Sequence, residues 1–168
     1  MEPKKCIPSA ITILNMSFGM ASLLYAGAGE YKYSAVMILI AAALDATDGR
    51  VARRLGACSA FGKELDSLAD VVSFGVAPAI LVFLAEFAHG LFFPGLVVSF
   101  LFAACGAIRL ARFNLSKLPH FEGVPITVAG GLAGGSILAA NLLPAWFYLG
   151  IVTILAFLMV SRFRVPKL

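Results

Sequence analysis

The sequence predicts an all-α membrane protein, with six transmembrane helices packed as a bundle in one domain that spans residues 1–168. Of the 168 residues, 61% are hydrophobic and only 13% are charged. The mean hydropathy is +0.95. A soluble domain carries about twice this share of charged residues, so the surroundings of this chain are mainly lipid. The length suits one compact domain.

Six apolar stretches are each long enough to cross about 30 Å of hydrocarbon, which takes about 20 helical residues. They cover residues 7–28, 33–54, 64–87, 91–114, 127–143 and 145–163. Only Pro144 separates the last two, so we expect them to form an antiparallel hairpin. The glycine-rich run 128–136 in the fifth stretch is typical of a face that packs closely against another helix.

Charge placement predicts the orientation of the bundle. Of 13 Lys and Arg residues, only Lys32 falls at one set of helix ends. The others are Lys4, Lys5, Arg50, Arg53, Arg54, Lys63, Arg109, Arg112, Lys117, Arg162, Arg164 and Lys167. The positive-inside rule makes their side cytoplasmic, together with both termini. The sequence therefore predicts a multi-pass cell-membrane protein, and topology explains the basic residues without any nucleic-acid binding.

Four aspartates stand at helical spacing within this apolar chain. Asp45 and Asp48 are three residues apart in the second stretch, and Asp66 and Asp70 are four apart in the third. Each pair therefore shares one face of its helix. A short loop makes the two helices antiparallel neighbours, so the acidic faces can oppose each other. An ionised carboxylate at membrane depth costs several kcal/mol unless something compensates its charge, and a divalent cation is a natural compensator.

Carboxylates without a His or Cys pattern favour Mg²⁺, Mn²⁺ or Ca²⁺ over zinc. Four of them can hold two ions, and two ions can clamp the attacking and leaving oxygens of a phosphoryl displacement. The small residues Gly49 and Ala52 would let a ligand approach the backbone, and Arg53 could pair with a phosphate. Three other hypotheses remain: a metal-free acid–base network, the ion or proton pathway of a transporter, and a structural subunit, which leaves the aspartates unexplained.

The spacing of these residues resembles the full signature of the CDP-alcohol phosphatidyltransferase family. The run reads Asp45-x2-Asp48-Gly49-x2-Ala52-Arg53-x8-Gly62-x3-Asp66-x3-Asp70. The resemblance implies a six-helix membrane bundle, usually a homodimer, with a two-metal site that faces the cytoplasm. It also implies attack of an alcohol on the lipid-linked phosphorus of a CDP-lipid, with CMP as the leaving group.

By this resemblance the four aspartates would be metal ligands, and Asp70 would also be the general base that takes the proton of the alcohol. The nucleotide would contact a set of residues that comprises Asp48, Gly49, Ala52, Arg53 and Gly62. Asn15, an amide in the first apolar stretch, either borders this pocket or joins helices by hydrogen bonding.

The acceptor alcohol is indicated by other segments, which resemble the phosphatidylserine synthase branch of the family. They include residues 66–78, residues 108–114 and the Phe121–Glu122–Gly123–Val124–Pro125 run. The branch implies L-serine as acceptor, whose carboxylate calls for a cation such as a bidentate arginine. Arg109 and Arg112 are three residues apart, so both can face inward, unless they serve only topology. Ser73 would line the acceptor pocket or simply pack between helices.

Several alternatives stay open from the sequence. A sister enzyme that uses glycerol 3-phosphate or an inositol phosphate would need a denser basic pocket, which the two arginines do not exclude. The lipid tail can be diacylglycerol or archaeol, because a groove of aliphatic side chains accepts either. An ion-coupled transporter is the competing function of another class.

Overall fold

The computed structural model describes residues 3–55, 59–115, 121–161 and 164–165. Six helical segments follow one another, as the sequence predicts. They are α1 (Pro3–Gly27); α2 (Tyr31–Leu55); a third helix made of α3 (Ala60–Asp70), η1 (Val71–Val76), α4 (Ala77–Val82) and η2 (Phe83–Phe87); α5 (Phe92–Leu115); α6 (Ile126–Ser136) with the 3₁₀ turn η3 (Ile137–Leu142); and α7 (Ala145–Val160). The all-helical class is confirmed, apart from a pairing of two-residue strands, β1 (Phe121–Glu122) and β2 (Arg164–Val165).

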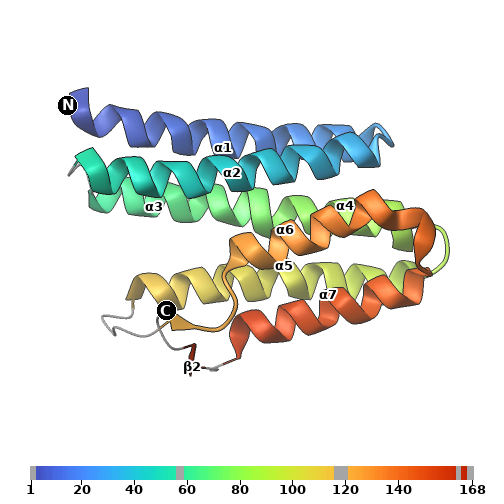
Figure 1. The fold of residues 1–168 in the computed structure, drawn as a ribbon. Coiled ribbons are helices and arrows are strands. Elements are labelled where there is room, and N and C mark those ends of the chain that lie inside the picture. Colours follow the sequence, from blue (N-terminus) through green and yellow to red (C-terminus); the bar gives the residue numbers. More distant parts are fainter. Residues whose placement is uncertain (1–2, 56–58, 116–120, 162–163, 166–168) are drawn as a thin grey trace.

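The helices run roughly parallel or antiparallel in one bundle (Figure 1). The α1–α2 hairpin and the third helix lie on one side, α5 and α7 lie on the other, and α6 lies between them. The predicted hairpin of the last two helices is present, since α6 and α7 run in opposite directions and contact each other (Figure 1). The start of α1, the end of α2, the start of α3 and strand β2 all lie at the same end of the bundle (Figure 1).

The α1–α2 hairpin turns through Gly29, whose φ of 81° lies in the left-handed region that favours glycine. A buried hydrogen bond of 2.8 Å joins the hydroxyls of Ser22 and Ser34 across the two helices. Such hydrogen bonds help helices to associate in a bilayer. Apolar side chains alone do not drive this association, because they contact lipid as favourably as they contact another helix.

The third helix begins at Ala60, four residues before the predicted start, because Ser59 caps it by accepting a 3.0 Å hydrogen bond from the Gly62 amide. It then widens into a π-helical turn, η1, directly after Asp70. Pro78 follows in α4 and cannot donate a backbone hydrogen bond to the preceding turn. Wide turns of this kind are frequent at functional sites. This one rotates the residues beyond Asp70 around the helix axis, relative to where a regular α-helix would place them.

Glycines of α6 allow close contact with two neighbouring helices. A Cβ at Gly130 would collide with the backbone of Phe74 in η1, and one at Gly134 would approach the Ile38 side chain of α2 to 2.7 Å. The prediction that the glycine-rich run is a packing face is therefore confirmed. The core lies where α6 meets these helices and α5.

The outer surface is that of a membrane protein. Three helices within the described residues are long and apolar enough to span a bilayer: Ser9–Gly27, Ala60–Phe87 and Phe92–Leu115. Large apolar side chains point outward from α5, where Phe93 is 78% exposed and Phe100 is 73% exposed. Water would not tolerate such a continuous apolar surface, whereas lipid does. The other three predicted spans are less distinct: α2 carries charged residues, and the apolar helices that begin at Ile126 and Ala145 are shorter.

Candidate metal centre

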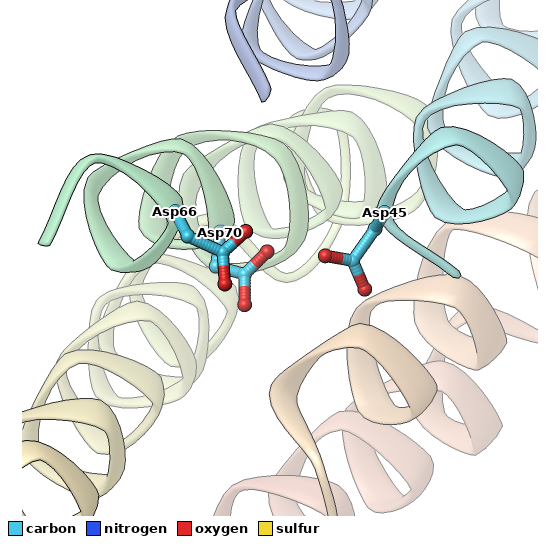
Figure 2. Close-up of side chains that lie close together, drawn as sticks. All are labelled: Asp45, Asp66 and Asp70. Carbon is cyan, nitrogen blue, oxygen red and sulfur yellow. The ribbon is translucent and has the colours of Figure 1, made fainter. Parts of the chain in front are cut away.

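Three of the four predicted aspartates form one cluster. Asp45, Asp66 and Asp70 each offer a carboxylate oxygen, and these oxygens all lie within 4.8 Å of one another. Figure 2 shows Asp66 and Asp70 side by side on α3, facing Asp45 on the opposite helix α2. Asp70 is the most buried of the three, at 7% exposure. The opposed acidic faces expected from the spacing are thus present for these residues.

This donor set fits a divalent cation. It consists of hard carboxylate oxygens, and among the described residues no His or Cys belongs to the cluster. Oxygen ligands of this kind suit Mg²⁺, Mn²⁺ or Ca²⁺. Three partly or fully buried carboxylates in such proximity repel one another, so a bound cation would relieve a large electrostatic cost.

The remaining residues of the motif lie on the same two helices. Gly49 is half-buried in α2, and Gly62 is half-buried in the first turn of α3. Asp48, Ala52 and Arg53 belong to α2, but their side chains lie outside the described part of the structure.

Asp45 has a hydrogen-bond partner that the sequence analysis missed. The Thr127 hydroxyl, at the start of α6, donates to Asp45 Oδ2 at 3.2 Å. The two residues are 82 positions apart, and Thr127 belongs to no motif that we considered. One signal was available: Thr127 is the first residue of the fifth predicted span, and that end of the span is predicted to lie on the cytoplasmic side, as the aspartates are.

Arg109 and Arg112 occupy different environments. Arg109 is buried in α5, at 9% exposure, and interacts electrostatically with Asp70. Arg112 is exposed in the last turn of the same helix. Of these two arginines, only Arg109 therefore adds a positive charge to the buried surroundings of the carboxylates.

A second contact between helices fixes α5 next to the cluster. The side-chain amide of Asn114 donates to the Ser67 hydroxyl at 2.9 Å, and Ser67 directly follows Asp66. Nearby, the Lys63 ammonium lies 5.3 Å from the centre of the Phe113 ring, a cation–π distance. Ser67 is another residue that sequence reasoning missed. These contacts hold the helix that carries Arg109 against the helix that carries Asp66 and Asp70.

Asn15 and Ser73 meet where α1 packs against η1 of the third helix. Both are fully buried, and the Ser73 hydroxyl donates to the Asn15 backbone carbonyl at 3.2 Å. Gly19 makes this approach possible, because a Cβ there would collide with Ser73. The side-chain amide of Asn15 has no hydrogen-bond partner among the described residues. A buried amide without a partner is costly, which makes Asn15 a candidate for ligand contact.

The fold and the cluster define a helical membrane protein with a candidate divalent-cation centre. Residues 5–165 match the family described as CDP-alcohol phosphatidyltransferase, and the chain belongs to this family.

Three relatives illustrate the range of the similarity. The CDP-diacylglycerol–serine O-phosphatidyltransferase of Helicobacter pylori is 38% identical over 179 residues, with 99% of this chain and 74% of that protein covered. The Bacillus subtilis protein of the same name is 40% identical over 166 residues, with 95% and 89% covered. The archaetidylserine synthase of Methanothermobacter thermautotrophicus is 40% identical over 127 residues, with 73% and 54% covered.

Proposed function

We propose that this protein is an enzyme of the CDP-diacylglycerol–serine O-phosphatidyltransferase type. It transfers a phosphatidyl or archaetidyl group from a CDP-lipid to the hydroxyl of L-serine and releases CMP. The names of its relatives support this reaction. The observation that carries it is a buried arginine, Arg109, that interacts electrostatically with Asp70, one of three clustered carboxylates. This combination suits two substrates, a CDP-lipid that carries a pyrophosphate and an acceptor that carries a carboxylate.

A sister enzyme with a phosphorylated acceptor is less well supported, because Arg109 is the buried arginine of the described site and Arg112 is exposed.

The metal ligands in this proposal are Asp45, Asp48, Asp66 and Asp70, which would hold two divalent cations, Mg²⁺ or Mn²⁺, with Ca²⁺ as a further candidate. Such ions neutralise the charge of the pyrophosphate and of the departing CMP. The geometry of three of the four carboxylates supports the assignment.

Asp70 is the proposed catalytic base. The serine hydroxyl oxygen forms a bond to the lipid-linked phosphorus while the bond from that phosphorus to the CMP oxygen breaks. The hydroxyl proton passes to the Asp70 carboxylate, which is a suitable general base when it lies beside the acceptor. Its burial and its proximity to Arg109 support a place between the metal ligands and the acceptor.

The acceptor pocket is proposed to contain Arg109, Arg112 and Ser73. Arg109 would bind the serine carboxylate, because a buried guanidinium makes strong bidentate hydrogen bonds with a carboxylate. Arg112, at the exposed end of α5, would contact a phosphate. Ser73 lies one turn beyond Asp70, and its hydroxyl is already bonded to α1, which favours a role in shaping the pocket.

The nucleotide pocket is proposed to lie between α1, α2 and the start of α3. Small residues would admit the CDP group close to the backbone, and polar ones would contact it. The set comprises Asn15, Asp48, Gly49, Ala52, Arg53 and Gly62.

The proposed topology has six membrane spans, with both termini and the metal centre on the cytoplasmic side. The distribution of Lys and Arg supports it. The path of α3 (Ala60–Asp70) supports it too, since this helix carries Asp66 and Asp70 and begins at the same end of the bundle as α1 (Figure 1). We also propose that residues 1–168 form one domain and that the protein acts as a homodimer, as the family resemblance implies.

The test is CMP release by the purified protein with a CDP-lipid and Mg²⁺ or Mn²⁺. L-Serine, glycerol 3-phosphate and inositol phosphate are compared as acceptors, and CDP-diacylglycerol and CDP-archaeol as donors. We expect release that requires both serine and metal. Release only with a phosphorylated acceptor would contradict the serine assignment, and no release with any acceptor would favour transport.

A further inference from the structure

We propose that Thr127 is a positioning residue for the metal centre: its hydroxyl holds the Asp45 carboxylate in the orientation that binds a cation. The inference rests on the proposed metal-dependent function. The observation that carries it is the 3.2 Å hydrogen bond from Thr127 Oγ1 to Asp45 Oδ2.

This hydrogen bond can orient the Asp45 carboxylate and still leave it free to bind a cation. A threonine hydroxyl donates one proton, and a carboxylate has lone pairs for several partners. One lone pair of Asp45 Oδ2 is used by Thr127, and the others remain available to the cluster. Partners of this kind, which bind a ligand and not the metal, commonly set the orientation of metal-binding side chains.

Thr127 does not make the local hydrogen bond that is usual for a hydroxyl on a helix. Thr47, Ser67 and Thr153 each donate to the backbone carbonyl four residues earlier, as helical hydroxyls commonly do. Thr127 stands in the first turn of α6, where no preceding helical carbonyl is in place, and it bonds across to α2. Its hydroxyl is therefore committed to a contact between elements that are distant in sequence.

The start of α6 is held in place by tight packing. The Ile126 side chain is 1% exposed, and it lies against Gly106 of α5 so closely that a Cβ there would come within 2.6 Å of it. Four residues into the helix, Gly130 packs against the backbone of Phe74. A hydroxyl that starts from so constrained a backbone can define the position of its partner.

The segment before α6 is anchored to the end of α7. The Val124 amide donates to the Leu158 carbonyl at 3.2 Å, and β1 pairs with β2 just beyond α7. Gly123 has a φ of 73° and lies against the carbonyls of Leu158, Met159 and Ser161, where a side chain would not fit. The last helix thus supports the backbone from which Thr127 reaches Asp45.

The test is a titration of purified protein with Mn²⁺, followed by electron paramagnetic resonance of the free ion. Thr127→Val removes the hydroxyl with little change of shape, and Thr127→Ser keeps the hydroxyl. Thr153→Val is the matched control, because the Thr153 hydroxyl donates within α7 to the Leu149 carbonyl and Thr153 lines an apolar pocket between α5 and α7. We expect Thr127→Val to weaken Mn²⁺ binding about tenfold, Thr127→Ser to recover most of that loss, and Thr153→Val to bind as the unchanged protein does.

Unchanged Mn²⁺ affinity in Thr127→Val would overturn the inference, and so would an equal loss in Thr127→Ser or in Thr153→Val. Thr127→Ala provides the same comparison if the valine variant does not fold. The proposed function is judged separately by CMP release from the unchanged protein. If that protein binds Mn²⁺ but releases no CMP with serine, the function is wrong, and the Thr127 comparison still decides the role of this residue.

Discussion

Arg109 of α5 is buried beside Asp70 of the third helix, and the two side chains interact electrostatically although they come from different helices. The arginine thereby adds positive charge to a site that is otherwise acidic. A carboxylate-bearing acceptor placed there would meet a cation at one end and the proposed base at the other.

We therefore predict that Arg109→Ala raises the KM for serine about 10- to 100-fold, because a hydrogen bond to a charged group contributes about 1.5–3 kcal/mol. The KM for the CDP-lipid should change much less. Arg112→Ala is the comparison, since Arg112 is exposed on the same helix. Steady-state kinetics with each substrate varied in turn measures the difference. Equal increases in both KM values for Arg109→Ala would indicate a phosphate contact instead.

Asp66→Asn should abolish serine-dependent CMP release while the protein still folds. The loss of one ligand charge removes several kcal/mol of stabilisation from the bound cation, so we expect a decrease of at least about a thousandfold. Glu64→Gln, a neutralised acid on the exposed side of α3, should retain activity. Activity and Mn²⁺ dependence are measured together with thermal unfolding. Full activity with normal metal dependence in Asp66→Asn would exclude this residue as a ligand.

Asn15→Ala should raise the KM for the CDP-lipid about tenfold, with little change in the melting temperature. The physical reason is that the amide has no partner among the described residues, so its hydrogen bonds are available to a ligand, and one such bond is worth about 1–1.5 kcal/mol. Kinetics and thermal unfolding in detergent test this. A lower melting temperature with an unchanged KM would show that Asn15 joins helices and does not contact the nucleotide.

Gly130→Ala should destabilise the protein by about 1–3 kcal/mol, because its Cβ would collide with the backbone of Phe74. Gly131→Ala is the matched control: no atom lies within 4 Å of a Cβ at that position. Alanine there should be neutral or slightly stabilising, since it favours a helix over glycine by up to about 1 kcal/mol. Thermal unfolding of both variants measures the contrast. Equal stability of the two variants would contradict the close contact of α6 with η1.

The sequence alone determined the membrane class, the six helices and the pairing of Asp66 with Asp70 on one face. These features depend on composition and on a helical period of a few residues, and both are local properties of the chain. It also indicated that Asp45 would face that pair, because a short loop leaves two helices few ways to pack.

Only the tertiary structure decided which side chains complete the site. Two arginines three residues apart are equivalent by spacing, but the packing of α5 buries Arg109 and leaves Arg112 exposed. Thr127 reaches Asp45 because α6 is fixed by contacts with α5, η1 and the end of α7. Such pairings join residues that are distant in sequence, so the period of a single helix carries no information about them. These contacts form only when whole helices pack against one another.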